Sequence, residues 1–161
     1  MPRFFALLSA IMLFSTLAGS PPAQAQSSVT VDEPWARATV PQQKVSGAFM
    51  RLTAQRDARL LRAESPVAGV VEIHEMKMDG DVMRMRAIDG LELPARRAVD
   101  LRPGGYHLML MELRQPLTAG QTISLQLTIE HRDGTRERIE VQAQVRAMSG
   151  GPAGHSMPHK P

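Results

Sequence analysis

The most informative absence in this sequence is cysteine, because none of its 161 residues is one. Zinc sites built on thiolates, thiol redox catalysis and the cysteine-ligated blue-copper centre all require that residue. These three kinds of site are therefore excluded. The chain also offers no cysteine that could carry a lipid.

Aromatic residues and clustered charges are scarce as well. Aromatic residues make up 4% of the chain, and the formal net charge is only +3. The basic and acidic residues are scattered, with no run of five or six charges of one sign. Binding to nucleic acid or to an anionic membrane surface needs clustered basic residues. We therefore expect neither a nucleic-acid partner nor a polybasic membrane contact.

The first 25 residues have the features of a cleavable export signal. Arg3 supplies a positive charge, and residues 4–19 form an apolar run that is short for a membrane span. Ala23-Gln24-Ala25 follows as a small-residue cleavage site. We predict cleavage after Ala25, a periplasmic location, and no membrane insertion of the mature chain.

Beyond the signal, turn residues recur about every 8 to 12 positions and no long stretch has helical periodicity. This spacing predicts an all-β fold, an antiparallel sandwich or barrel, over residues 26–147. Residues 148–161 are rich in glycine and proline and are expected to form a flexible tail. The predicted strands are residues 45–53, 60–63, 70–78, 82–88, 99–101, 106–113, 123–130 and 137–145.

Methionine is abundant where cysteine is absent: the chain has eleven. Methionine specifies core packing poorly, so an excess of it suggests another use. Residues i and i+2 of a strand share one face, so both members of a His-x-Met pair point to the same side. Three such pairs occur, and they are His74/Met76, His107/Met109 and His155/Met157.

A predicted hairpin brings more methionines to the first pair. If Asp79 and Gly80 are the loop residues, His74 lies opposite Met85. If Gly80 is instead the first loop residue, Met76 lies opposite Met85. In both registers Met85 shares the face of His74, so either arrangement gathers imidazole and thioether groups.

This set of side chains indicates copper. A single methionine or histidine on a strand is usually structural, but here several such residues converge on one face. Thioether sulfur is a soft, uncharged ligand that suits Cu(I), and imidazole binds copper in either oxidation state. Without a thiolate, the combination favours copper over zinc.

At these residues the sequence resembles the PCuAC family of periplasmic copper chaperones, whose motif is His-x10-Met-x21-His-x-Met. His74, Met85, His107 and Met109 match it in type and spacing. The segments around them, and Pro34-Trp35-Ala36-Arg37 near the mature N-terminus, are similar too. The resemblance extends from about residue 29 to residue 145.

The resemblance implies a cupredoxin-like β-sandwich with Greek-key connections and a Cu(I) site made of those four residues. It further implies a carrier rather than an enzyme, which delivers copper to cytochrome c oxidase subunit II or to another copper-assembly protein. A periplasmic copper buffer or resistance protein is the alternative. Met76 is an alternative ligand in one hairpin register, whereas Met78, Met83 and Met111 are expected to pack around the site.

The C-terminal tail is a separate hypothesis. Some members of the PCuAC family carry an extension rich in histidine and methionine, and this shorter tail is similar. We expect His155, Met157 and His159 to form a labile secondary site that captures Cu(II) or assists copper transfer, because Cu(II) prefers nitrogen ligands.

Overall fold

The computed structural model describes residues 27–147, which form ten strands and no helix. Accordingly, this part of the chain holds no helix long and apolar enough to cross a membrane. The strands are β1 (Val29–Arg37), β2 (Val45–Ala54), β3 (Ala58–Glu64), β4 (Val70–Asp79), β5 (Val82–Ile88), β6 (Leu91–Leu93), β7 (Ala98–Leu101), β8 (His107–Met111), β9 (Thr122–His131) and β10 (Arg136–Arg146).

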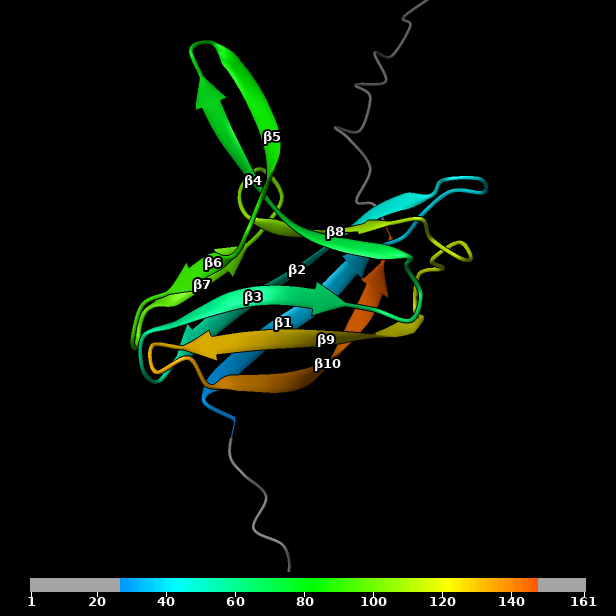
Figure 1. The fold of residues 1–161 in the computed structure, drawn as a ribbon. Coiled ribbons are helices and arrows are strands. Elements are labelled where there is room, and N and C mark those ends of the chain that lie inside the picture. The colour runs from blue at the N-terminus through cyan, green and yellow to red at the C-terminus, as the bar shows by residue number, and fades with distance from the viewer. Residues whose placement is uncertain (1–26, 148–161) are drawn as a thin grey trace, which may run out of the picture.

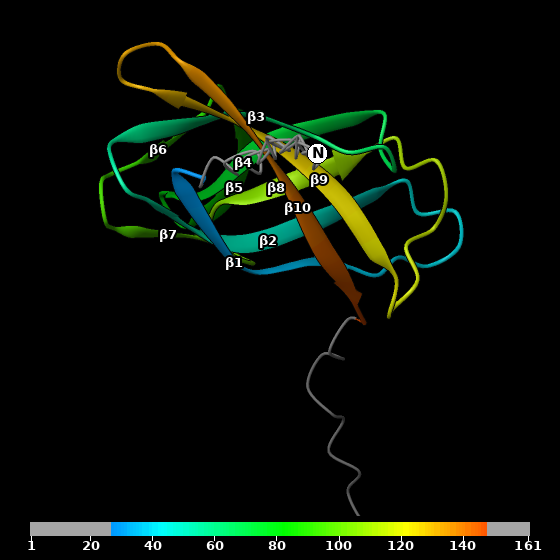
Figure 2. The same cartoon turned by 90° about the horizontal axis from the view of Figure 1, so that it is seen from below.

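The strands lie in two layers that share one continuous hydrogen-bonded path. Its order is β5-β4-β8-β2-β1-β10-β9-β3-β6, and β7 pairs with β2. In Figures 1 and 2, β9 and β10 lie across the layer that contains β2 and β8. The expected all-β, cupredoxin-like antiparallel sandwich is confirmed. It contains one parallel pair, β1 with β10, which joins the two layers.

Large aliphatic side chains from both layers fill the space between them. Along β9 the alternating residues Ile123, Leu125, Leu127 and Ile129 are buried, and their neighbours are more exposed. β8 contributes Leu108 and Leu110 from the other layer, each with no exposed surface. Because strand side chains alternate, the other residues of β8 point to the opposite, outer face of that layer, and they are His107, Met109 and Met111.

A β-bulge in β1 turns Trp35 onto this same outer face. Val29 and Val31 pair with β2 in one register, and the register shifts between Asp32 and Trp35. Glu33 has a positive φ of 48° at this point. One extra residue reverses the alternation of a strand. Without the bulge, Trp35 would share the core-facing side of Val29 and Val31.

The β4–β5 hairpin projects from the body of the molecule (Figure 1). β4 pairs with β8 only from Val70 to His74, and from there to its end it pairs with β5 alone. Of the two registers predicted, the one that places Met76 opposite Met85 is found, and the one that places His74 opposite Met85 is wrong. Gly80, with φ 63°, occupies the first loop position, where the left-handed conformation favours glycine.

Two strands were not predicted, namely β1 and β6. In β1, Pro34 and the bulge interrupt the alternation that would have indicated a strand. β6 has only three residues between Gly90 and Pro94, which is too short for periodicity to be visible. Both strands are held by pairing with distant segments of the chain, which local sequence does not encode.

A polar cluster attaches the start of β1 to the β9–β10 hairpin. The backbone N–H of Ser28 donates to Glu137 Oε1 at 3.2 Å, and the Ser28 hydroxyl donates to Glu137 Oε2. His131 Nε2 lies 3.3 Å from Ser28 Oγ. Partial burial alone would raise the pKa of Glu137. The hydrogen bonds from Ser28, Ser27 and His131 outweigh that effect and hold this pKa below its ordinary value.

We predict that Glu137→Gln destabilises the fold at neutral pH by about 1 kcal/mol, because the hydrogen bonds to a charged acceptor are weakened. A carboxylate whose pKa is lowered on folding stabilises the protein above its unfolded pKa. That stabilisation is lost as pH falls through the folded pKa. Urea unfolding of the wild type and of Glu137→Gln at several pH values measures the difference in their free energies of unfolding. This difference should narrow below about pH 4. A constant difference at every pH would contradict this account.

Candidate metal site

The predicted ligands gather on the outer face of the layer formed by β5, β4, β8 and β2. His74 pairs directly with His107 across β4 and β8, and Glu72 pairs with Met109. Met76 pairs with Met85 across β4 and β5. Directly paired residues of antiparallel strands point to the same side of a sheet. All six side chains therefore lie on one face, although they come from three strands.

The loop before β8 orients His107. Gly104 takes a φ of 81°, and Gly105 N–H donates to Arg102 O at 3.0 Å. The carbonyl of Gly105 then accepts two hydrogen bonds, from Met76 N–H at 3.3 Å and from His107 Nδ1 at 3.1 Å. A carbonyl can only accept, so Nδ1 carries a proton, and in the neutral imidazole Nε2 keeps its lone pair.

That lone pair faces a sulfur atom. His107 Nε2 lies 3.2 Å from Met85 Sδ. In the neutral ring with its proton on Nδ1, neither of the two facing atoms is a donor, so the two lone pairs face each other. A cation bound between His107 Nε2 and Met85 Sδ would be coordinated by both lone pairs.

His74 is oriented by a different partner. Its Nε2 lies 2.8 Å from Glu72 Oε2, and a carboxylate oxygen accepts the proton. In the neutral ring the lone pair of His74 is therefore on Nδ1, which is buried and has no hydrogen-bond partner among the described residues. The His74 and His107 rings are 5.7 Å apart between centroids. An orphaned imidazole nitrogen beside a second imidazole fits a metal ligand, and the carboxylate would fix its orientation.

A cavity of about 310 Å³ opens on this face. Its lining includes Met76, Met85, His107 and Met109, while His74 lies beside it across from His107. Residues 27–147 contain no group of three or more His, Cys, Asp or Glu side chains able to hold a metal. The donors at this cavity are instead two imidazoles and several thioethers, a set suited to a soft ion.

The aromatic ring of Phe49 lines one side of the cavity, with Trp35 behind it. Phe49 is buried although it points to the outer face, because Trp35 covers it with ring centroids 4.4 Å apart. Phe49 also lies 6.3 Å from the His107 ring. Gly47 leaves room for this arrangement, since a Cβ built there would lie 2.8 Å from Phe49 Cζ. His107 itself is buried beside this ring, with 6% of its surface exposed.

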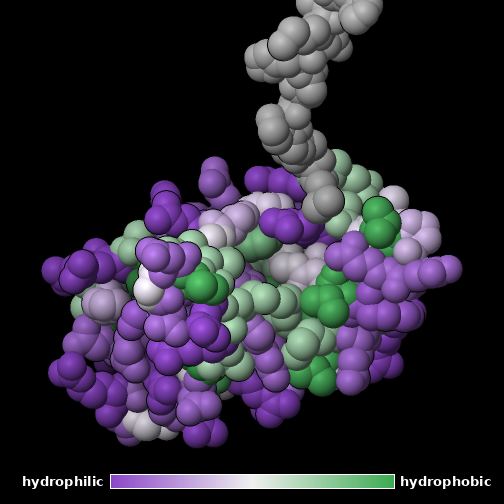
Figure 3. Space-filling model, turned by 90° about the horizontal axis from the view of Figure 1, so that it is seen from above, coloured by the Kyte–Doolittle hydropathy of each residue, from purple (hydrophilic) through white to green (hydrophobic). Residues whose placement is uncertain are grey.

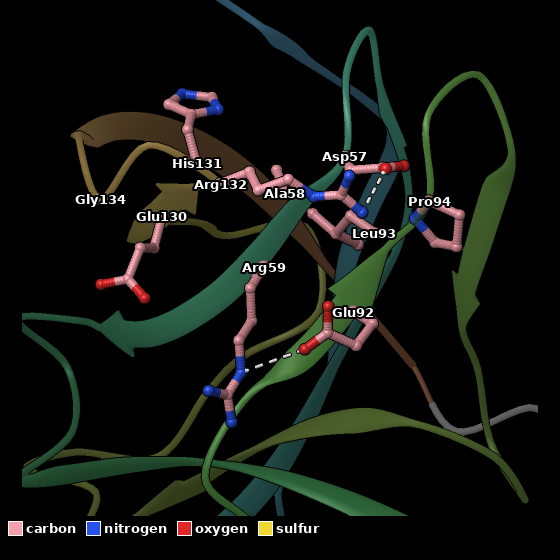
Figure 4. Close-up of a pocket in the computed structure, with 10 residues that line it drawn as sticks. All are labelled: Asp57, Ala58, Arg59, Glu92, Leu93, Pro94, Glu130, His131, Arg132 and Gly134. Carbon is pink, nitrogen blue, oxygen red and sulfur yellow. Dashed lines mark ion pairs between the residues drawn. The ribbon is translucent and has the colours of Figure 1, made fainter.

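A second, larger cavity of about 420 Å³ lies beyond the other end of β2 and has a different chemistry (Figure 4). Two ion pairs join charged side chains of its lining: Arg59 with Glu92 at 3.5 Å and Arg132 with Asp57 at 2.9 Å. It is lined by one histidine, His131, and by no methionine. The size of this cavity does not make it the better candidate, because it offers no soft ligand.

The positions of the other methionines differ in part from expectation. Met76 lines the cavity, as an alternative ligand would. Met78 and Met83 were expected to pack around the site, but they are 54% and 48% exposed near the tip of the hairpin. The hairpin extends beyond β8, so nothing in the described part of the chain covers them. His155, Met157 and His159 lie outside the described residues.

A family model described as "LpqE-like: Putative lipoprotein LpqE-like" matches residues 29–145. The chain belongs to the LpqE-like family. A curated relative, "Putative lipoprotein Lxx21020" of Leifsonia xyli subsp. xyli, is 31% identical over 121 residues. That match covers 74% of this chain and 72% of the relative.

Solved structures similar to this LpqE-like chain are PCuAC domains, which confirms the predicted resemblance. The copper-bound PCuAC domain from PmoF2 has a TM-score of 0.60 at 23% identity, and the match covers 76% of this chain and 96% of that one. The Cu(I) form of DR1885 from Deinococcus radiodurans is 30% identical, with a TM-score of 0.54. That match covers 77% of this chain and 83% of DR1885.

Three contributors to the site were not predicted from the LpqE-like sequence: Glu72, Gly47 and Phe49. Glu72 could have been found, because it lies two residues before His74 in a predicted strand and therefore shares its face. Phe49 could not, since its burial depends on Trp35 and hence on the bulge in β1. Gly47 is explained only by the ring that occupies the space beside it.

We predict that Gly47→Ala destabilises the LpqE-like domain by about 1–3 kcal/mol, because the new methyl group collides with Phe49 between Trp35 and His107. Urea unfolding measures the change. Gly105→Ala is the matched control, since a Cβ there meets its nearest atom at 3.5 Å, an ordinary contact. Equal stabilities for the two variants would contradict the proposed role of Gly47.

Proposed function

We propose that this protein is a periplasmic metallochaperone that binds one Cu(I) ion through His74, Met85, His107 and Met109. On this proposal it delivers the ion to the copper centre of a respiratory cytochrome c oxidase. The observation that carries the proposal is the convergence of two imidazole rings and thioether sulfur on one outer sheet face. His107 Nε2 and Met85 Sδ are already 3.2 Å apart, and His74 Nδ1 has no other partner in the described part.

The donor set favours Cu(I) over other ions. Imidazole nitrogen and thioether sulfur are uncharged and comparatively soft, so they do not compensate the charge of a hard divalent cation. The nearest carboxylate, that of Glu72, is already bonded to His74 Nε2. Copper-bound PCuAC relatives, among them the Cu(I) form of DR1885, support copper as the ion.

The position of the site supports a carrier rather than an enzyme. The site lies on the outside of the sandwich, and Met85 is 48% exposed while its sulfur reaches His107. A carrier must hold its ion and still give it to a partner by exchange of ligands, which an accessible thioether permits. The exposure of the site and the absence of a thiolate ligand also argue against an electron-transfer cupredoxin.

Export is supported by two independent observations. The family and the relative from Leifsonia xyli are both described as lipoproteins, a class of exported proteins. The first 25 residues have the charge, the apolar run and the cleavage pattern of an export signal. Since the 161 residues include no cysteine for a lipid, we propose release into the periplasm after cleavage.

We predict that His74→Ala and Met109→Ala each weaken Cu(I) binding by about tenfold or more, because each removes one ligand, a loss of about 1.4 kcal/mol or more. Competition with a chromophoric Cu(I) chelator measures the affinity. Met111→Leu is the matched control: it lies on the same strand and face as Met109 and should keep wild-type affinity. Unchanged affinity in both alanine variants would reject this ligand set.

Deletion of the gene tests delivery. At limiting copper, a strain without this protein should lose cytochrome c oxidase activity, and added copper should restore it. Normal oxidase activity together with increased sensitivity to copper would instead support a periplasmic copper buffer or resistance protein. The first outcome supports delivery and the second supports buffering, and both are compatible with the same copper site.

A further inference from the structure

The projecting part of the β4–β5 hairpin has two chemically distinct faces. Cross-strand pairing places Met76 opposite Met85 and Met78 opposite Met83, and because these pairs are two residues apart they lie on one face. The opposite face is charged, and its ion pairs include Arg84 with Asp79 at 2.8 Å. Val82 is the apolar side chain on that charged face.

The four methionines of the first face, here called the methionine face, continue the face that carries the predicted copper ligands. His74 lies two residues before Met76 on β4, so it begins the same row. At the inner end of the row, Met85 Sδ is already 3.2 Å from His107 Nε2. At the outer end, Met78 and Met83 are 54% and 48% exposed. The row therefore leads from the solvent to the site without a break.

Stability does not explain this choice of residues. A two-stranded hairpin outside a sheet gains little from a half-exposed side chain with no neighbour to pack against. β-branched or charged residues would serve better at such positions, and charged residues occupy the other face. Four thioethers are present instead on the face that continues the site. Thioether sulfur differs from the side chains usual in strands in one relevant property, its affinity for soft cations.

We propose that Met78 and Met83 form an outer binding site for Cu(I), and that Met76 and Met85 connect it to the ligands at His107. This inference rests on the proposed function. Successive methionine pairs are about 7 Å apart along the strands, a distance that two long, flexible side chains can span together. At each step one copper–thioether bond forms as another breaks. The copper stays in the +1 state, so no oxidant or reductant is needed.

The test is a titration of the full chain, carrying methionines labelled with ¹³C at the methyl group, with Ag(I) as a redox-inert substitute for Cu(I). The first equivalent should shift the signals of Met85 and Met109, and the second should shift those of Met78 and Met83. Signals resolved by residue distinguish the hairpin from the C-terminal Met157.

The variant that tests the outer site carries Met78→Leu and Met83→Leu together, which preserves volume and apolarity while removing two sulfur atoms. It should keep the affinity for the first equivalent. The rate at which a soluble chelator removes Cu(I) should fall by about tenfold. Val82→Leu is the matched control, because it alters the tip of the same hairpin on the other face, and it should exchange Cu(I) at the wild-type rate.

The outer site would be overturned if the signals of Met78 and Met83 in the wild-type chain did not respond to the second equivalent of Ag(I). It would also be overturned if the double variant lost Cu(I) to the chelator at the wild-type rate, or if Val82→Leu lost Cu(I) as slowly as the double variant. A variant that exchanges normally with the chelator but slowly with a protein acceptor would also overturn it, in favour of a protein-docking surface. Failure of the first equivalent to bind would instead reject the proposed function, so the two failures are distinguishable.

Discussion

The pairing of His74 on β4 with His107 on β8 is the contact on which the candidate site depends. It fixes the relative register of two strands that are far apart in the sequence, and the alternation of each strand then determines which other side chains join them. A slip of one residue would turn His107 and Met109 toward the core and bring Leu108 and Leu110 out to the solvent. The burial of these leucines therefore holds the register, and the packing of the sandwich positions the proposed metal ligands.

The outer face of a sandwich is normally exposed to water, yet this one carries a partly enclosed site. The enclosure comes from a ring stack rather than from another layer of structure. The bulge in β1 turns Trp35 outward, Trp35 covers Phe49, and Phe49 fills the space that Gly47 leaves open beside His107. A soft ion held there would have an apolar wall on one side and accessible thioethers on the other. This combination suits a site from which the ion must also leave.

Orientation of the two imidazoles relies on their neighbours. His107 donates to the carbonyl of Gly105 and His74 donates to the carboxylate of Glu72, so a different nitrogen of each ring is left without a protein acceptor. Similar partners orient histidine ligands in many metal sites. Gly105 also accepts a hydrogen bond from Met76, so one loop carbonyl sets the angle of His107 and the point where β4 leaves the sheet. Beyond that point the hairpin is free to extend outward with its methionine face.

The sequence by itself determined the class of fold, the kind of ion to propose and the residues to consider. Alternation and turn spacing are local properties, and the absence of cysteine with an excess of methionine is a matter of composition. The spacing of His74, Met85, His107 and Met109 was sufficient to recognise the PCuAC resemblance. Only the tertiary structure decided the hairpin register, the roles of Glu72 and Phe49, and the exposure of Met78 and Met83. The hairpin register and the role of Glu72 depend on which strands lie alongside, and the burial of Phe49 depends on one extra residue in β1. The exposure of Met78 and Met83 depends on where β8 ends. The sequence near each of these residues does not encode the distant contact that decides its role.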